Sequence, residues 1–506
     1  MPKDGFKVFS RVNFPVRWLV LATVSSALLL VVIDMAVLYT ALPDLTRDLK
    51  ASASDKLWIM NAYPLTVAGL LPGAGALCDR FGARRPFLSG LWIFGLASLL
   101  AAFAPSAEAL IGGRVLLAVG AALMMPATLA IVRRSFSDRR ERALAIGVWS
   151  AVASGGAALG PVVGGALLEF FPWGAVFLIN VPITVLAFIL ARKVVPVGGG
   201  HADRPFDAAA SLQVMIGLFG VTYAIQAAGD DLSLPPDVWV AGGTGALFLA
   251  LFVRGQRRST APIIDFSLFR DPAVSLGVLA ALMSTVALVG TELAVSQRFQ
   301  LVQGLSPLQA GLSIVPIPLA ACVAGPLAGL LLMTFGAVRV LWFSLALAGL
   351  GIVAHLAGID ADAGIVAQTG TFVMIGAGIG AAMTAASTAI MAGASARSAG
   401  AAASLEEVSY ELGGSIGLAL LGSLLAAVYS ASMELPAGVV AGEQALDGID
   451  AALSVARAQG GEVALALVDA AGTAFDVAFR TVLTVAAALL FATSAAIALT
   501  GARRRI

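Results

Sequence analysis

Charged side chains are scarce in this sequence. Only 12% of its 506 residues are Asp, Glu, Lys or Arg, whereas 59% are hydrophobic and the mean hydropathy is +0.94. Soluble globular domains carry about 25% charged residues, so the composition predicts a polytopic membrane protein. The net charge is only +1. Because there is no basic excess, we expect no nucleic acid among the partners.

Cysteine and histidine are also rare. Cys78 and Cys322 lie at or inside hydrophobic runs, which argues against a disulfide framework. His201 and His355 are too few and too far apart in the sequence to suggest a metal site, and neither H-E-x-x-H nor a P-loop occurs. The sequence therefore predicts no metal, no cofactor and no enzyme activity. A membrane-embedded enzyme or sensor is the weaker alternative.

Long apolar runs fill most of the chain. Runs of about 18 or more residues are candidate membrane spans, and we count fourteen: 17–42, 57–77, 87–104, 110–132, 143–168, 174–191, 208–228, 237–253, 273–297, 307–332, 338–357, 365–392, 402–429 and 477–500. The first run is too long for the apolar part of a signal peptide. We therefore expect it to be retained as a helix.

The charges between these runs are distributed unevenly. Of the 31 lysines and arginines, 24 fall in the termini and in the loops on the same side, whereas the opposite loops are acidic, for example at Asp44, Asp230 and Asp360. By the positive-inside rule, both termini lie in the cytoplasm. The expected location is the plasma (inner) membrane, which the chain crosses many times in contact with lipid.

Three carboxyls lie in an apolar run, at Glu406, Glu407 and Glu411. Each is expensive to place in the membrane, by ~2.5–3.5 kcal/mol. Glu407 and Glu411 are four residues apart and share a helix face, where like charges repel. Repulsion and burial both favour the neutral form, so we expect at least one to hold a proton near neutral pH. These residues predict a water-filled path with proton-carrying walls, although Glu406 could instead lie at the wet membrane edge.

Other charged residues also fall inside the apolar runs. Asp34 lies about seventeen residues into the first run, which contains no Lys or Arg within helical reach to pair with it. Arg114 is either an intramembrane arginine or reaches a nearby surface. Glu292 is either an outer acidic site or the partner of Arg298.

A short loop after the second run has the spacing G-x-L-x-D-R-x-G. Its members are Gly75, Asp79, Arg80 and Gly82, followed by Arg84. The glycines allow a tight turn, and Asp79 beside arginines can form an ion pair that locks one conformation. This loop resembles the loop signature of the major facilitator superfamily.

Two further segments carry the same resemblance. The fifth run contains G-x-x-x-G-P-x-x-G-G at Gly156, Gly160, Pro161, Gly164 and Gly165. Small residues allow close helix packing and proline bends the helix. The segment is similar to the antiporter motif of the superfamily's drug exporters. The surroundings of Arg114 resemble its intramembrane arginine motif.

The fourteen runs, Asp34 followed by Ala41-Leu42-Pro43, and the Glu406-Glu407 pair with Glu411 narrow the resemblance. They are similar to the fourteen-helix drug:proton antiporters, and to quaternary-ammonium and methyl-viologen efflux pumps in particular. The resemblance implies that Asp34 and the glutamates handle protons and cations. One departure is Asn61, since these pumps usually have an aspartate there.

The resemblance implies an all-α polytopic membrane protein with the major facilitator fold. We expect residues 1–191 to form one six-helix bundle and residues 192–272 to be a linker with two additional transmembrane helices. Residues 273–506 would form the second six-helix bundle, with a long external loop at 430–476. In that loop, residues 443–458 and 462–471 have helical propensity.

The implied function is a monomeric proton-coupled antiporter. It would export lipophilic cations such as quaternary ammonium compounds, methyl viologen and dyes by alternating access, driven by the proton gradient, and so confer multidrug and antibiotic resistance. The alternative is an exporter of an endogenous metabolite or antibiotic. Asn61 and five aromatic residues are candidates for the cavity wall, where rings attract cations: Tyr63, Trp149, Phe177, Tyr223 and Tyr410.

Overall fold

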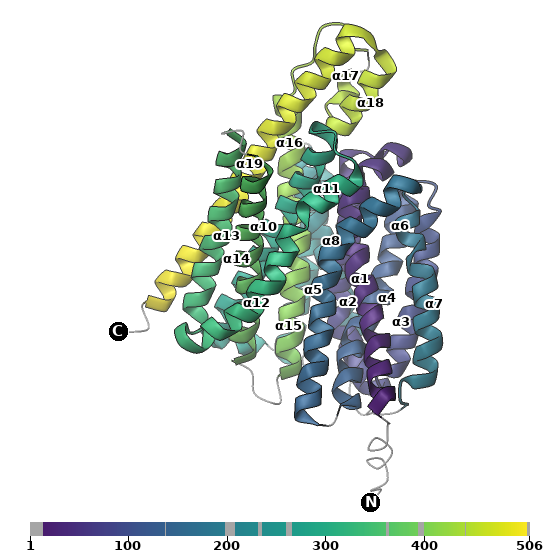
Figure 1. The fold of residues 1–506 in the computed structure, drawn as a ribbon, viewed down its shortest axis with the longest axis vertical. Helices are drawn as coiled ribbons and strands as arrows, with labels where there is room; N and C mark the ends of the chain where they lie inside the picture. Colours follow the sequence, from purple (N-terminus) through teal and green to yellow (C-terminus); the bar gives the residue numbers. More distant parts are fainter. Residues whose placement is uncertain are drawn as a thin grey trace, which may run out of the picture.

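Helices make up the protein. The computed structural model describes residues 14–136, 138–197, 208–230, 235–259, 266–360, 364–392, 399–440 and 442–502, and no strand occurs in these ranges. Most helices run alongside one another, and both described ends of the chain lie toward the lower end in Figure 1. The predicted all-α class is therefore confirmed.

The first part of the chain forms nine helices in the described residues: α1 Phe14–Leu49, α2 Ala53–Phe81, α3 Arg84–Ala102, α4 Ala107–Ser135, α5 Arg139–Phe170, α6 Ala175–Leu178, α7 Asn180–Val194, α8 Ala208–Asp230 and α9 Pro236–Arg258. Local sequence explains several boundaries. Ser52 and Asp55 form a capping box at the start of α2, and Gly82 ends that helix with a φ of 80°.

The second part of the described chain begins with the short 3₁₀ helix η2 and contains two π-helical turns, η3 and η4. Its elements are η2 Phe266–Arg270, α10 Pro272–Gln297, η3 Arg298–Val302, α11 Pro307–Ile314, α12 Pro316–Phe335, α13 Ala337–Asp360, α14 Ile365–Ala392, α15 Ala399–Gly417, η4 Leu418–Gly422, α16 Ser423–Ser432, α17 Gly442–Ala445, α18 Ile449–Gln459 and α19 Gly461–Ala502. A second capping box, between Ser306 and Gln309, starts α11.

Eleven helical segments in the described residues are long and apolar enough to cross a membrane, so the chain is a multi-pass membrane protein. Three predicted spans are not among them, and they fall within α2, α5 and α8. Within α5 and α8 there are shorter apolar stretches, Gly155–Phe170 and Ala209–Ile225. The count of fourteen therefore remains a prediction.

Two large apolar cores lie side by side. One is built mainly from α1 to α7 and contains Phe87, Phe94 and Phe136, whereas the other is built mainly from α10 to α19 and contains Phe372 and Phe475. A smaller third cluster joins α8, α9 and η2 to α14 and α15. Side chains from α10 and η4 also enter the first core. The contact between the two cores is the region where the candidate site lies.

The segment that follows α16 differs from the predicted loop. The short helices α17 and α18 lie at the top of Figure 1, away from the chain ends. Helix α19 then runs without a break over 42 residues. The predicted helix at 462–471 is therefore the beginning of the last long helix rather than a separate element. We call the end of the protein that carries α17 and α18 the loop end.

Candidate functional site

Asp34 lies in the middle of α1 and is bound from two other helices. Arg114 of α4 donates from Nη1 to Asp34 Oδ2 at 2.6 Å, and Asn180 of α7 donates from Nδ2 to Oδ1 at 2.9 Å. Asp34 and Arg114 are both 1% exposed, and Asn180 is also buried. The partner that Asp34 lacks in its own helix thus comes from α4. The sequence indicated both charges but did not indicate that they pair.

Arg114 is buried and does not extend to the surface. Its Nε donates to the carbonyl oxygen of Ile59 at 3.2 Å, and its guanidinium carbon lies 4.5 Å from the centre of the Tyr63 ring. The interpretation that this side chain reaches a nearby surface is therefore wrong. A cation–π contact of this kind is worth ~2 kcal/mol or more when it is shielded from water. Tyr63 is a wall of this charged cluster.

The three glutamates of α15 differ in their surroundings. Glu411 is buried, and its Oε2 has no hydrogen-bond partner among the described residues. Glu406 is partly exposed and lies 3.4 Å from the hydroxyl of Tyr410, which is also 3.2 Å from the carbonyl oxygen of Met383. Glu407 is partly exposed as well. Glu411 is therefore the carboxyl of this helix that is most shielded from solvent.

Two tyrosines lie between the charges of the two cores. Tyr63 is within electrostatic range of Asp34, Arg114 and Glu411. Tyr39 is within range of Arg114, Glu411 and Glu292. Tyr39 did not stand out in the sequence as a site residue, because an aromatic residue in an apolar helix is usually a packing residue. The structure thus gathers charges from α1, α4, α10 and α15 into one region.

Glu292 is not paired with Arg298. Arg298 instead donates from Nε to Asp476 Oδ1 of α19 at 2.8 Å, and its guanidinium packs over the ring of Phe479. The alternative in which Glu292 and Arg298 pair is therefore wrong. Glu292 is left as an acidic residue close to Tyr39.

The glycines of the G-x-x-x-G-P-x-x-G-G segment bring α5 against two neighbours. A Cβ at Gly160 would overlap the Cβ of Ala36, and one at Gly164 would lie 2.5 Å from Cγ2 of Val37. Gly156 faces the same helix, α1, at Leu29 and Val32, and Gly165 faces Leu308 of α11. The close approach expected from the small residues is present. It fixes the part of α1 that carries Asp34.

Pro161 takes part in the second of these contacts. Its carbonyl oxygen lies against Gly311 of α11, where a Cβ would not fit. Helices α5 and α11 come from the two different parts of the chain. The segment therefore packs α5 against α1 on one side and against α11 on the other.

The loop signature forms the turn between α2 and α3. Gly82 has a positive φ, and Arg84 donates from Nη2 to the carbonyl oxygen of Arg192 at the end of α7, at 2.5 Å. Arg80 is exposed and packs over Phe81, and Gly75 has open space beside it. The side chain of Asp79 lies outside the described residues. The structure thus shows Arg84 holding the end of α7.

Three of the aromatic candidates lie outside the charged cluster. Phe177 is buried in the first core, edge-on to Trp173. Tyr223 of α8 is 36% exposed and donates to Asp237 Oδ2 at 2.6 Å. Trp149 donates from its indole nitrogen to Thr128 Oγ1 at 3.2 Å. Only Tyr63 and Tyr410 among the five contact charged residues of the candidate site.

Asn61 has an unusual environment. It is fully buried in α2, and neither its side-chain oxygen nor its nitrogen has a hydrogen-bond partner in the described part of the chain. Buried amides are nearly always hydrogen-bonded in proteins. Asn61 therefore has its full hydrogen-bonding capacity available for water or a ligand.

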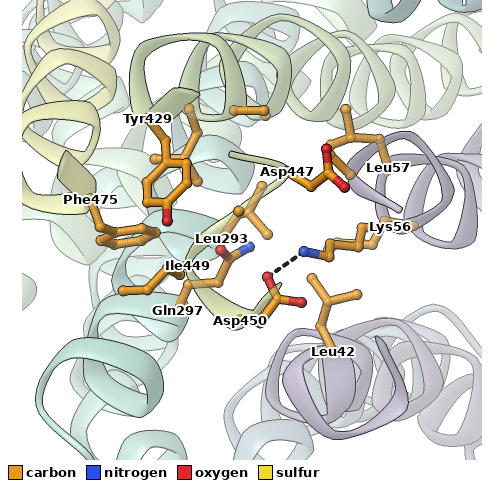
Figure 2. Close-up of a pocket in the computed structure, with 16 residues that line it drawn as sticks. Leu42, Lys56, Leu57, Leu293, Gln297, Tyr429, Asp447, Ile449, Asp450 and Phe475 are labelled. Carbon is orange, nitrogen blue, oxygen red and sulfur yellow. Dashed lines mark hydrogen bonds and ion pairs between the residues drawn. The ribbon is translucent and has the colours of Figure 1, made fainter. Parts of the chain in front are cut away.

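A pocket opens at the loop end, lined by residues of α1, α2, α10, α16 and α18 among others. Figure 2 shows Lys56 of α2 pointing at Asp450 of α18, with which it forms an ion pair. Asp450 Oδ2 also accepts from Thr46 Oγ1 of α1 at 3.3 Å. Asp447 and Tyr429 line the same pocket. Helix α18 is thus attached to α1 and α2 by a charged contact.

The site offers buried acids with few cations. In the described residues, no group of three or more His, Cys, Asp and Glu side chains could hold a metal ion. Arg114 is occupied by Asp34, whereas Glu292, Glu407 and Glu411 form no ion pair with described residues. Such carboxyls can bind either a proton or a positively charged guest, but not both at full strength.

Comparisons with known proteins agree with the resemblance seen in the sequence. Residues 24–418 match the Major Facilitator Superfamily. The methyl viologen resistance protein SmvA of Salmonella typhimurium is 40% identical over 91% of this chain and 93% of its own length. The multidrug efflux pump LfrA of Mycolicibacterium smegmatis is 36% identical over 96% of this chain and 97% of its own length.

Solved structures show the same fold at lower identity. A bacterial homologue of the human lysosomal transporter Spinster, in an inward-facing and occupied conformation, superposes with a TM-score of 0.66. It is 18% identical, and the superposition covers 95% of this chain and 97% of that one. At this identity the likeness concerns the fold alone.

Proposed function

Because this chain belongs to the major facilitator superfamily, and is thus a membrane transporter rather than an enzyme, we propose that it exports lipophilic cationic drugs in exchange for protons. The observation that carries the proposal is the set of membrane carboxyls that have no cationic partner among the described residues, with Glu411 the most deeply buried. The relatives SmvA and LfrA are a methyl viologen resistance protein and a multidrug efflux pump. Methyl viologen, quaternary ammonium compounds and dyes are therefore the proposed substrates.

The proposed exchange follows from competition at the carboxyls. An ionised Glu407 or Glu411 attracts a cation from the cytoplasm, and protonation removes that attraction and releases the cation outside. Asp34 is held by Arg114 and Asn180. Protonation of Asp34 would weaken its bond to Arg114 and free the guanidinium, so the proton state of α1 can change how α4 packs against it. Alternating access couples this change to the opening of one face at a time.

The same proposal includes the topology. The eleven long apolar helices together with α2, α5 and α8 make fourteen spans, with both termini in the cytoplasm. The loop end is then external. Residues 1–191 and 273–506 would be the two moving bundles, with α8 and α9 in the connecting segment 192–272. We propose that a single chain is the working unit, surrounded by lipid.

An exporter of an endogenous metabolite or antibiotic is the alternative. An anionic substrate would require an available cation in the spans, but Arg114 is paired with Asp34 and Arg298 with Asp476. The buried charge that remains is acidic. The geometry therefore favours a cation.

The proposal is tested with Asp34→Asn. This change keeps the size of the side chain but removes the group that can gain and lose a proton. We expect energised efflux of ethidium from cells to fall to the level of cells without the protein, while the amount in the membrane is unchanged. Wild-type efflux by the variant would show that Asp34 has no role in coupling.

A further inference from the structure

One continuous helical segment carries three buried polar atoms that lack a partner. Glu411 Oε2, Ser415 Oγ and Ser423 Oγ form no hydrogen bond to any residue that the structure describes. These residues are 8%, 0% and 4% exposed. A buried polar group without a hydrogen bond is unfavourable, because it has lost its bonds to water and gained none in return. Three such atoms within one membrane segment indicate that the segment normally contacts water or another polar group.

The π-helical turn η4 aligns these three residues. Glu411 and Ser415 are four residues apart and share a face. Ser423 is eight residues beyond Ser415, which in a regular α-helix would turn it about 80° away from that face. Because η4, Leu418–Gly422, lies between them and accommodates one additional residue, most of this rotation is cancelled. The three side chains therefore form a strip along one side of α15 and α16.

Helix α2 adds a fourth polar residue to this strip. Leu57 packs against Gly422, where a Cβ would lie 2.5 Å from the leucine Cδ2. Asn61 lies one turn further along the same face of α2, at the depth of the segment between Ser415 and Gly422. Neither the oxygen nor the nitrogen of its buried amide has a hydrogen-bond partner among the described residues, so both atoms can bind water. Two helices thus present unpartnered polar groups to the same interface.

Helix α10 packs against the π-helical turn from another side. Gly290 of α10 lies against Leu421 of η4, where a Cβ would lie 2.2 Å from the leucine Cδ1. This contact holds η4 in place beside α10.

The strip ends next to the pocket of Figure 2. Gly422, next to Ser423, lines that pocket together with Leu57 and Leu293. The pocket is polar at its other side, where Lys56, Asp447 and Asp450 lie. One end of the strip is thus the buried carboxyl of Glu411, and the other end, Ser423, adjoins a polar pocket at the loop end.

We propose that this strip is a water-filled proton route from the external pocket to Glu411, in which Ser415 and Ser423 hold the water. The inference rests on the proposed proton coupling and specifies its external path. A hydroxyl can accept a proton on its oxygen while it releases its own hydrogen to the next water, so each serine is unchanged after transfer. The proton finally converts the Glu411 carboxylate into a carboxylic acid. Asn61 orients the water through its amide, which is unchanged after the transfer.

The charged and titratable groups around the route are few. Glu407 precedes Glu411 on the same helix, and Tyr63 of α2 and Tyr39 of α1 are within electrostatic range of Glu411. Lys56, Asp447 and Asp450 lie at the pocket. Ser415 also falls in the string Gly413–Gly417, which matches the hydrolase pattern G-x-S-x-G. That pattern requires a turn between a strand and a helix, whereas Ser415 is inside α15.

The test compares valine with threonine at Ser415 and at Ser423. The two side chains have the same shape, but only threonine keeps a hydroxyl. In proteoliposomes with an imposed pH gradient, we expect ethidium-driven proton movement to slow at least tenfold in Ser415→Val and Ser423→Val. Ser415→Thr and Ser423→Thr should stay within threefold of wild type. Ethidium affinity should change less than twofold in all four variants.

A control on the same helix is Ser409→Val. Ser409 is buried like the others, but its hydroxyl already donates to the carbonyl oxygen of Leu405 at 2.6 Å. This variant should keep normal proton movement. Equal rates for the valine and threonine variants would overturn the route while leaving the antiport intact. A wild-type protein that binds ethidium but moves no protons would overturn the proposed function itself, and the route with it.

Discussion

The buried guanidinium of Arg114 contacts three neighbours: Asp34, the carbonyl oxygen of Ile59 and the ring of Tyr63. Arginine can do this because its planar group donates in several directions and stacks on an aromatic ring. The pair with Asp34 need not add stability, since both charges lose their hydration. Removing one partner is destabilising, because the other charge is then left buried without an opposite charge.

This asymmetry predicts a non-additive response. Arg114→Leu leaves Asp34 without its cation and should lower the stability of the purified protein by about 3–5 kcal/mol. The double variant Asp34→Asn with Arg114→Leu should be more stable than Arg114→Leu alone, because no unpaired charge remains. Thermal unfolding in detergent measures both. Additive losses would mean that the two side chains do not interact in the folded protein.

Single residues also show where reasoning from the sequence stops. Asp34, Arg114 and Glu411 were recognisable because a charge in an apolar run is costly wherever it lies. The partners of Asp34 and Arg114 were not recognisable. Asn180 and Tyr63 come from other helices, and these contacts depend on how α1, α2, α4 and α7 pack. Arg298 shows the same limit, because its partner Asp476 is 178 residues away.

At the level of helices, the apolar runs predicted where most long helices lie, and capping residues explain several of the observed boundaries. The sequence did not indicate the π-helical turn η4, which has no residue signature, nor that α19 continues through the predicted loop. The glycine spacing in α5 was more informative, because only small residues allow two helices to approach so closely. It predicted the contact but not that α1 and α11 are the two partners.

That contact gives a prediction with an internal control. Gly160→Ala places a Cβ on top of the Cβ of Ala36, so α1 and α5 must separate and move Asp34. We expect ethidium efflux to fall at least fivefold. Adding Ala36→Gly should restore it, because the overlap is removed. Gly155→Ala lies on the same helix with open space beside it and should behave like wild type. A Gly160→Ala variant with full activity would show that the close approach is not needed for transport.

At the scale of the whole molecule, α18 connects the loop end to the first helices of the chain. The ion pair of Lys56 with Asp450, together with the bond from Thr46, attaches the loop end to α1 and α2 across the pocket. In the proposed export cycle the two bundles separate at this end before a substrate leaves, so the attachment would have to break in each cycle. Its side chains are mostly buried, which strengthens the pair relative to an exposed one.

Asp450→Asn should therefore favour the form that is open at the loop end. Opening can be measured with Leu57→Cys, because Leu57 lines the pocket. A cysteine there reacts with a membrane-impermeant thiol reagent when the pocket is open. We expect that reaction to be severalfold faster in the Asp450→Asn background. The charge exchange Lys56→Asp with Asp450→Lys should restore the slow rate, since the pair is re-formed with opposite polarity. Asp447→Asn is the control, because Asp447 lines the same pocket without bonding to Lys56. An unchanged rate in Asp450→Asn would mean that α18 does not hold the loop end closed.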